Sequence, residues 1–530
     1  MDMKTIATTF CDFDTLIKNH IYVDKTDLLW RLVSGKEDRN FFISRPRRFG
    51  KSLLLSTLEA IFRGRRDLFK GLKISKMKYD WTEYPVVMLD MSKQSAETVE
   101  GVRRNLYVLV DRLVKEFKLK DVDKAGSPGA YLGIFFEELA KQSANGKFVV
   151  LIDEYDVPLQ GFLNDRKAIA QVRKLMHDFY VQLKAHSKNI RFMMMTGVTK
   201  LTKLSVFSGL NTPKDLTMHP GDFATLLGYT PKEIERFFPK QLDKLARKLK
   251  TDRKGALNKL LGWYDSYRFS PDSPAKVCNP ISIGCALSEF NIRRFWMNTA
   301  TASLIYERLN ACGLSPASVE GVVVPESELD VCDALTMPAV PLMYQGGYLT
   351  IKDVVSDPSQ AGQARLRLGM PNEEVREAVR DGWFAETFGR RSDEMDSLAN
   401  RAKRLAADGD IDTLVCEALF AVYAKIPPQW KIRSEADAKR HFTLFMEMIG
   451  ANPLPEMPSA RGYADAIIET KKAVYVFEFK YAKSPAAAIR QIRDRGYANA
   501  YRNDKRPVTL VGIKFDPKVR NITIPKIEPL

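Results

Sequence analysis

The chain has 530 residues, which is too long for one hydrophobic core and favours about three or four domains. Hydrophobic residues make up 45% of it and charged residues 28%, as in ordinary globular proteins. No apolar run approaches the roughly 18 residues that a membrane helix needs, so we expect no membrane partner.

The net charge of +17 favours a polyanionic partner, because phosphates bound by Lys and Arg release counterions. Residues 431–530 alone carry 19 basic and 11 acidic side chains, a net +8. We expect nucleic acid, either DNA or RNA, as the partner, although a solvated basic surface would give the same composition. The sequence leaves a homo-oligomer open.

The N-terminus lacks a basic segment followed by an apolar core, so it does not read as a secretory signal and we expect a cytoplasmic location. The six cysteines form no C-x-x-C pair, and the five histidines show no zinc spacing. Reduced thiols without a zinc site are the expectation that follows.

The front half of the chain alternates apolar runs with helical patterns. The expected strands are 40–44, 86–91, 148–152 and 191–196, and the expected helices are 51–62, 97–117 and 166–183. Buried strands that alternate with helices predict a parallel sheet covered by helices on both faces. We therefore predict an α/β domain over residues 1–228.

After residue 228 the pattern changes to helices rich in Lys and Leu. Thr230 and Pro231 predict a helix start, with an N-cap followed by proline at the first helical position. Residues 229–410 are predicted to form a helical lid and a mixed adaptor region without assignable chemistry. Prolines within 453–458 (PLPEMP) predict irregular backbone near the start of a last domain, 411–530, because closely spaced prolines resist helix and strand alike.

Gly50-Lys51-Ser52 follows an expected strand and opens an expected helix. In that setting backbone N–H groups and the helix N-terminus hold phosphates, Lys51 reaches the terminal phosphates and Ser52 ligates Mg²⁺. The tripeptide therefore predicts a site for ATP with Mg²⁺. Arg45 stands where the full phosphate-loop pattern has its first glycine, and a tripeptide of this kind also arises by chance.

An acidic pair strengthens the prediction of a nucleotide site. Asp153 and Glu154 follow the apolar run 148–152, and acids at the carboxyl end of a central parallel strand can hold Mg²⁺ and orient the attacking water. We predict Asp153 as the metal-side residue and Glu154 as the catalytic base, the alternative being acids that cap the next helix or pair with a nearby Lys. Thr196 and Thr199 are candidates for sensing the γ-phosphate, the alternative being a helix cap or a turn.

Arg45, Arg47 and Arg48 crowd the loop before Gly50. Guanidinium groups beside a bound triphosphate would neutralise the charge that develops on the γ-phosphoryl group. We predict this nucleotide-binding role for the three arginines, the alternative being ion pairs with surface acids or contacts with nucleic acid.

The last domain carries a second constellation of acids and lysine. Residues 463–469 (YADAIIE) and 473–480 (AVYVFEFK) predict a hairpin, in which Glu478 and Lys480 share one face. Metal-dependent phosphodiester hydrolysis needs carboxylates to hold Mg²⁺ and a lysine to position water. Asp465, Glu478 and Lys480 supply these groups.

Two further residues are candidates for the same site. Glu435, on an expected helix, would add another ligand, and Gln491, on the helix after the hairpin, would orient substrate or water. The alternative for the whole Glu-Phe-Lys segment is a solvent-facing ion pair on an edge strand.

The front motifs resemble those of the bacterial predicted AAA-ATPase-like proteins that carry a C-terminal PD-(D/E)XK nuclease domain. The matching segments are Tyr22-Val23-Asp24-Lys25-Thr26, Ser44-Arg45-Pro46-Arg47-Arg48-Phe49-Gly50-Lys51-Ser52, Leu151-Ile152-Asp153-Glu154-Tyr155-Asp156, Ser208-Gly209-Leu210-Asn211 and Trp263-Tyr264-Asp265. The Arg-Pro-Arg-Arg-Phe loop is the form usual in this family. Thr212 and Ser266 depart from the family pattern at positions without proposed chemistry.

The last domain resembles the PD-(D/E)XK superfamily in the patterns G-x-x-D-x-x-I-E, E-F-K and Q-I-x-D-x-G-Y-A, which begin at residues 462, 478 and 491. The resemblance implies that Asp465, Glu478 and Lys480 form the catalytic triad. It gives Glu435 and Gln491 accessory roles.

The sequence thus predicts a P-loop NTPase sheet with a helical lid and adaptor, followed by an α/β PD-(D/E)XK nuclease-like domain. The leading hypothesis is an ATPase coupled to a Mg²⁺-dependent nuclease. A second is a nucleotide-switched nucleic-acid-binding protein with an inactive nuclease fold, which Tyr463, in place of the family's usual arginine, leaves room for. A third, an interaction scaffold without either activity, is disfavoured by the intact Lys51, Ser52, Asp153 and Glu154.

Overall fold

A computed structural model describes most of the chain. The described residues are 4–9, 12–35, 38–120, 122–124, 126–163, 165–200, 213–296, 301–312, 314, 316, 319–329, 338–355, 364–388, 400–402, 404–405, 408, 410, 413–424, 432, 434–448, 454–459, 462–470, 472–519 and 521–530. The chain forms two compact units: unit 1 is Met1–Asn298 with Gly321–Arg376, and unit 2 is Thr299–Glu320 with Glu377–Leu530. The boundaries expected at residues 228 and 410 stay predictions.

Unit 1 is built on a five-stranded parallel sheet with the order β2-β3-β4-β1-β5. Its strands are β1 (Asn40–Ser44), β2 (Val86–Asp90), β3 (Phe148–Asp153), β4 (Ile190–Gly197) and β5 (Lys214–Asp215). The central strands are mostly buried and apolar, as parallel strands covered on both faces are. The order places β4 between β1, which precedes the phosphate loop, and β3, which ends in the acids.

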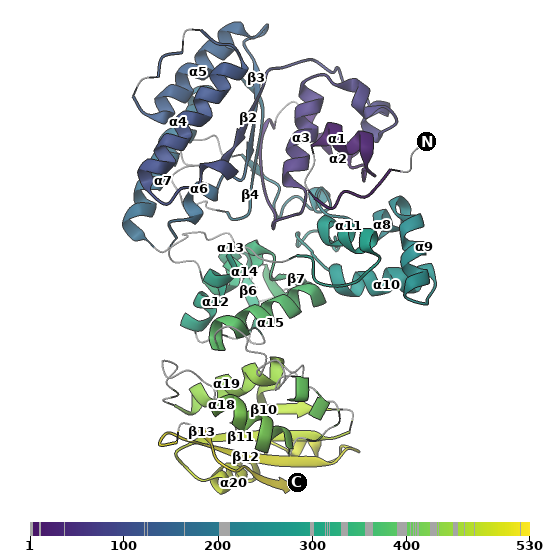
Figure 1. The fold of residues 1–530 in the computed structure, drawn as a ribbon, viewed down its shortest axis with the longest axis vertical. Coiled ribbons are helices and arrows are strands. Elements are labelled where there is room, and N and C mark those ends of the chain that lie inside the picture. The colour runs from purple at the N-terminus through teal and green to yellow at the C-terminus, as the bar shows by residue number, and fades with distance from the viewer. Residues whose placement is uncertain are drawn as a thin grey trace. The chain divides into compact units, whose positions relative to one another are not determined.

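Helices cover both faces of this sheet. Figure 1 shows α4, α5 and α7 on one face and α1, α2 and α3 on the other. The helices are α1 (Phe13–Asn19), α2 (Thr26–Val33), α3 (Lys51–Phe62), α4 (Val99–Glu116), α5 (Pro128–Gln142), the short α6 (Val157–Gln160) and α7 (Arg166–Ala185). The predicted α/β class is confirmed, while α1, α2 and α5 were not among the expected helices.

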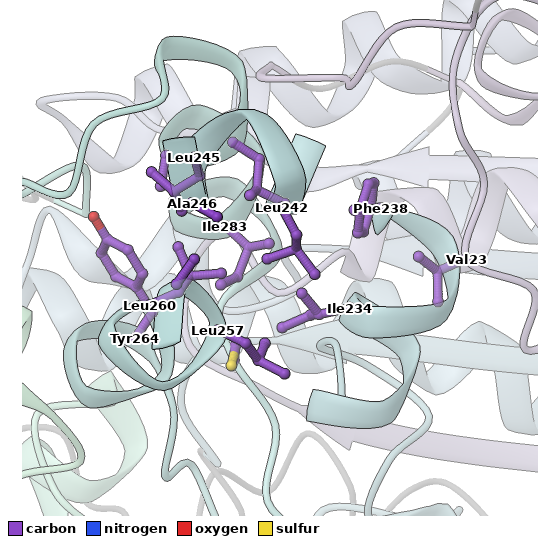
Figure 2. Close-up of a cluster of buried hydrophobic side chains, with 14 residues drawn as sticks. Val23, Ile234, Phe238, Leu242, Leu245, Ala246, Leu257, Leu260, Tyr264 and Ile283 are labelled. Atoms are coloured by element: carbon purple, nitrogen blue, oxygen red, sulfur yellow. The ribbon is translucent and has the colours of Figure 1, made fainter. Parts of the chain in front are cut away.

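A helical module follows the sheet in the chain. It consists of α8 (Pro231–Phe237), α9 (Pro239–Lys248), α10 (Arg253–Tyr264) and α11 (Pro280–Glu289). Thr230 caps α8 in a capping box with Glu233, so the helix begins where the Thr-Pro pair predicted it. The apolar core of the module is completed by Val23, more than 200 residues earlier in the chain, and Figure 2 shows Val23 at the end of the cluster formed by Ile234 and Phe238.

A small antiparallel sheet with the order β6-β8-β7 completes unit 1. The elements here are β6 (Val323–Pro325), α13 (Glu326–Leu329), α14 (Ala339–Gly346), β7 (Thr350–Val355) and β8 (Arg365–Gly369), followed by α15 (Glu373–Phe388), of which only Glu373–Arg376 belong to unit 1. Glu374 is buried and accepts hydrogen bonds from the backbone N–H groups of Phe295 (2.6 Å) and Trp296 (2.7 Å) and from Ser282 Oγ (2.8 Å). Burial raises the pKa of Glu374, although these hydrogen bonds oppose the shift.

Unit 2 contains a mixed sheet with the order β13-β12-β11-β10-β9, in which β14 also pairs with β12. Its elements are α12 (Thr301–Ala311), a π-helical stretch (Leu414–Leu419), α18 (Phe420–Ala424), α19 (Glu435–Met448), β9 (Leu454–Ser459), β10 (Gly462–Glu469), β11 (Val474–Tyr481), α20 (Pro485–Arg495), β12 (Val508–Asp516), β13 (Asn521–Ile522) and β14 (Lys526–Pro529). Figure 1 shows α18 and α19 on one side of these strands and α20 on the other. β10 and β11 pair antiparallel as the predicted hairpin, and β11 and β12 pair in parallel.

One backbone prediction was wrong. The proline-rich run at 453–458 was expected to be irregular, but most of it lies in β9, where Pro458 pairs with Tyr463 and Pro455 with Ala466. β9 is the last strand of the sheet order, and an edge strand tolerates proline because one of its sides needs no N–H donors.

No helix in the described part of the chain is both long enough and apolar enough to cross a membrane.

Candidate active sites

The phosphate loop connects β1 to α3. Gly50 precedes the first residue of the helix with φ of 95°, a left-handed conformation that glycine adopts without strain. Lys51 is 5% exposed, and its Nζ donates to the carbonyl oxygens of Arg45 (2.9 Å) and Pro46 (3.0 Å). Ser52 follows in the first turn of α3. The lysine is therefore held inside its own loop by backbone acceptors.

The acidic end of β3 lies on the same sheet, one strand further from the loop. Asp153 Oδ1 accepts a 2.6 Å hydrogen bond from Thr196 Oγ1 on β4, which joins two of the predicted residues directly. Glu154 takes a positive φ of 51°, so the chain turns sharply after the strand. Burial raises the pKa of Glu154, with Lys51 opposing the shift and Asp153 adding to it.

The pKa of Lys51 shifts in the opposite direction to that of Glu154. Burial lowers the pKa of Lys51, and the negative charges of Glu154 and Asp153 oppose that shift. The charges of Lys51 and Glu154 thus oppose the effect of burial on each other's pKa. The strand order therefore brings together the groups that the motifs predicted, and Asp153 is not used as a helix cap.

Asp156 lies in the same region and was not predicted to have a role. It is fully buried and accepts hydrogen bonds from the backbone N–H (3.0 Å) and Oγ1 (2.7 Å) of Thr199. Tyr155, beside it, donates from its hydroxyl to Thr199 O (2.8 Å). Thr199 is therefore fixed by the two residues that end the LIDEYD motif, and their place in that motif was the available signal.

The three loop arginines have different partners. The side chain of Arg45 is buried, with Nη1 donating to Ser44 O (2.9 Å) and Thr217 O (2.7 Å) and its guanidinium 4.2 Å from the ring centroid of Phe269. Burial lowers the pKa of Arg45 to about 10. These contacts give Arg45 a packing role between the loop and the segment after β5.

Arg47 and Arg48 lie nearer the surface. Arg47 is half-buried and donates to Gln160 Oε1 (3.0 Å), while Arg48 is exposed and donates to Phe295 O (2.9 Å). The backbone carbonyl of Arg47 accepts from Trp296 Nε1 (3.3 Å). Contacts with Gln160, Phe295 and Trp296 therefore hold this part of the loop.

A cavity lies beside Gly50 and the start of α3. The cavity is partly open to solvent, and its volume, counted with that open part, is about 480 Å³. Its walls are mainly apolar. Its lining includes Tyr22, Phe49, Leu53, Leu227 and Tyr229. The apolar walls thus lie directly beside the phosphate loop.

The second site is in unit 2. Glu435, Asp465 and Glu478 each place a carboxylate oxygen within 4.8 Å of those of the other two. Lys480 Nζ lies among them and donates to Glu435 Oε1 (2.9 Å), to Glu478 Oε1 (3.0 Å) and to Phe479 O (2.7 Å). Glu478 is 1% exposed and Lys480 is 6% exposed, on a strand between β10 and β12, so the pair is not a solvent-facing ion pair at a sheet edge.

Backbone groups orient the same acids. The N–H of Phe479 donates to Asp465 Oδ2 (2.8 Å), and the N–H of Tyr481 donates to Glu435 Oε2 (3.2 Å). Aromatic packing of Phe442 on Phe479, with ring centroids 4.7 Å apart, holds α19 and therefore Glu435 against β11. Contacts with β11 thus orient the carboxylates that come from α19 and β10.

The arrangement fits a divalent cation. Burial raises the pKa of Glu478, Asp465 adds to the shift, and Lys480 opposes it. Glu478 Oε2 is buried and has no hydrogen-bond partner among the described residues. A buried oxygen without a partner, next to two further carboxylates, is the donor set that Mg²⁺ or Mn²⁺ prefers.

Lys439 at this cluster was not predicted. Its Nζ lies 3.3 Å from Asp465 Oδ1, and it stands four residues after Glu435, a spacing that puts both residues on one face of α19.

Gln491 lies on α20 and donates to Tyr497 Oη (3.3 Å). The side chain of Tyr463 and the motif at residues 208–211 lie outside the described part of the structure.

Comparison with known families identifies both regions. Residues 8–207 match the family model described as Predicted AAA-ATPase, and residues 435–524 match the PD-(D/E)XK nuclease superfamily. These two matches confirm the resemblance found in the sequence.

Individual proteins are also similar. A protein of Azotobacter chroococcum mcd 1, described as an uncharacterized protein in the vnfD 5' region, is 28% identical over 519 residues, which cover 95% of this chain and 94% of that protein. The solved structure of the Aeropyrum pernix ORC2 protein in ADPNP-ADP complexes has a TM-score of 0.29 and 13% identity, covering 70% of this chain and 98% of that chain.

Proposed function

We propose that this chain binds and hydrolyses ATP and couples that cycle to a metal-dependent nuclease acting on DNA or RNA phosphodiesters. The observation that carries the proposal is the cluster of Glu435, Asp465 and Glu478 around Lys480. Three carboxylates within ligand distance of one another suit a divalent cation, and a buried lysine among them suits chemistry on a phosphate.

At the nuclease site the three acids would hold Mg²⁺ or Mn²⁺. The metal, when bound, would lower the pKa of a water and offset negative charge on the phosphate. Lys480, oriented by Glu435 and Glu478, would donate to the attacking water and position it against the phosphorus. The N–H of Phe479 would keep Asp465 turned toward the site throughout.

At the nucleotide site Lys51 would exchange its hydrogen bonds to loop carbonyls for bonds to the terminal phosphates. Ser52 and Asp153 would stand on the metal side, and Glu154 would orient the attacking water. Thr196 donates a hydrogen bond to Asp153 and would thereby connect this carboxylate to the end of β4.

Other residues near the loop would contact the γ-phosphate and the base of the nucleotide. Arg47 and Arg48 would add positive charge beside the γ-phosphate. The mainly apolar cavity beside Gly50 would take the base between Tyr22 and Tyr229.

The test is direct. Purified protein is incubated with plasmid DNA, linear DNA and RNA in Mg²⁺ or Mn²⁺, with and without ATP. The proposal expects metal-dependent cutting that Asp465→Ala abolishes. If no substrate is cut in any nucleotide state, the alternative of a nucleotide-switched nucleic-acid-binding protein with an inactive nuclease fold replaces the nuclease.

A further inference from the structure

A second lysine besides Lys480 contacts the acidic cluster of unit 2. Lys439 Nζ lies 3.3 Å from Asp465 Oδ1, and the two side chains are only 19% and 17% exposed. Lys480 contacts the other two acids, Glu435 and Glu478. The ammonium groups of Lys439 and Lys480 thus both contact carboxylates of this cluster.

Each carboxylate oxygen of Asp465 has one contact in this arrangement. Its Oδ2 accepts from the backbone N–H of Phe479, a residue of β11 that is paired with Ile513 of β12 and cannot move without disturbing the sheet. Its Oδ1 faces Lys439. A divalent cation bound to Asp465 would lie close to the ammonium group of Lys439, and the two like charges would repel each other.

We propose that Lys439 neutralises Asp465 until a divalent cation displaces it, and that the displaced ammonium then pairs with the phosphate of the substrate. The four-carbon stem of lysine allows its charge to swing between two such partners while the backbone of α19 stays in place. The second half rests on the proposed nuclease function, whereas the first half concerns metal binding alone.

The displacement of Lys439 from Asp465 has opposite consequences for the affinity of the site for metal and for nucleic acid. Before metal binds, Lys439 weakens the affinity of the cluster for a cation. Once metal and substrate are present, Lys439 strengthens the hold on the phosphodiester, since Asp465 no longer engages it. Metal and substrate would thus each favour the binding of the other.

The test uses full-length protein without nucleotide. Mn²⁺ binding is measured by calorimetry for wild type, Lys439→Gln and Lys472→Gln, and Glu478→Gln identifies the part of the signal that belongs to this cluster. Lys472 is the matched control: it is exposed, lies before β11 at the end far from Lys480, and donates to the carbonyl oxygen of Asp408 (3.1 Å). We expect Lys439→Gln to bind Mn²⁺ about fivefold more tightly, the upper range for a partly exposed ion pair, and Lys472→Gln to match wild type.

The second measurement is binding of a short DNA duplex and a short RNA in Ca²⁺, which prefers the same oxygen ligands. We expect Lys439→Gln to bind one of them about fivefold more weakly than Lys472→Gln does. A lysine that only supports the fold would instead lower both affinities when removed.

The results separate the two proposals. Equal or weaker Mn²⁺ binding by Lys439→Gln overturns the inference even if wild type cuts nucleic acid. Tighter Mn²⁺ binding by Lys439→Gln, in a protein that cuts nothing, supports displacement by metal while the proposed nuclease activity fails.

Discussion

The backbone N–H of Phe479 donates a 2.8 Å hydrogen bond to the carboxylate of Asp465, so the strand that carries Glu478 and Lys480 also orients the acid of the neighbouring strand. This bond depends on the register of β10 and β11, in which Ala466 is opposite Phe477. A shift by one residue would point Glu478 and Lys480 to the other face of the sheet. The geometry of the proposed metal site is thus fixed by strand pairing.

The first prediction concerns the nuclease residues. Asp465→Ala and Glu478→Ala should lose both metal affinity and cutting, while Lys480→Ala should keep metal and lose at least about 100-fold in cutting rate. Calorimetry with Mn²⁺ and cleavage of labelled DNA and RNA measure the two quantities. All three variants should still bind nucleic acid with a steep salt dependence, because the basic surface is unchanged.

Asp465→Asn is the control for geometry, since its amide oxygen can still accept from Phe479. It should unfold at the wild-type temperature yet fail to bind metal. Normal cutting by Asp465→Ala would remove this residue from the site.

The second prediction concerns the nucleotide. Lys51→Ala should abolish ATP binding because it removes the charge that meets the terminal phosphates. Glu154→Gln should bind ATP normally and hydrolyse it at least about 100-fold more slowly. A fluorescent ATP analogue and a phosphate-release assay measure the two steps, with the exposed Glu100→Gln on α4 as control. Hydrolysis at the wild-type rate by Glu154→Gln would reject its role as the base.

The third prediction is communication between the two activities. ATP should change the cleavage rate or the nucleic-acid affinity several-fold, within the usual range of allosteric coupling of about 1–3 kcal/mol. Lys51→Ala should lack the response while retaining basal cutting. Equal cleavage rates in nucleotide-free, ADP-bound and ATP-bound protein would reject the coupling.

The fourth prediction concerns the link between the N-terminal segment and the helical module. Lys25 Nζ donates to both carboxylate oxygens of Glu233, each at 2.9 Å, and to Thr225 O at 2.6 Å. Burial lowers the pKa of Lys25, and Glu233 opposes the shift. Glu233→Gln, which keeps the helix cap, should destabilise unit 1 by about 3 kcal/mol, because it leaves a buried charge without its partner.

A double-mutant cycle with Lys25→Met, followed by chemical denaturation, measures the coupling of this pair. The double variant should be more stable than the sum of the two single effects predicts. Additive losses would show that the pair contributes only through separate contacts.

The fifth prediction is a pH dependence set by Glu374. Because burial raises the pKa of Glu374 in the folded protein, the unfolded chain releases this proton first as pH rises. The stability contributed by the protonated carboxyl is therefore full below the ordinary glutamate pKa of about 4.3. It is lost as pH rises through the higher pKa of the folded protein. Glu374→Gln keeps acceptors for Phe295 and Trp296 without a charge.

Thermal unfolding of wild type and Glu374→Gln from pH 4 to pH 8 measures this contribution. Wild type should lose stability relative to the variant as pH rises, whereas the exposed Glu373→Gln should follow wild type. A constant difference between wild type and Glu374→Gln across the range would contradict the assignment.

Much of the fold could be predicted because its signals are local. Buried apolar runs marked β1 to β4 to within two residues, and α3 began at Lys51 as expected. The acids and lysine of β10 and β11 were found because alternation along a strand fixes which side chains share a face. α5 was missed because its buried residues lie on most of its circumference, which blurs the helical period.

The unpredicted features depend on neighbours that are distant in the chain. Arg45 reads as a phosphate ligand until Thr217 and Phe269 are seen to surround it. β9 reads as a proline-rich linker until its place at the sheet edge is known. Lys439 reads as an ordinary helical lysine, since only tertiary structure brings Asp465 beside it.

Val23 completes the core of the helical module although it precedes α8 by more than 200 residues. A recombination event that exchanged residues 229–298 alone would give the incoming helices a foreign residue at this position. Val23 and its contacts at Ile234 and Phe238 must therefore be inherited as a set. Within this lineage, substitutions at the two places should be found to change together.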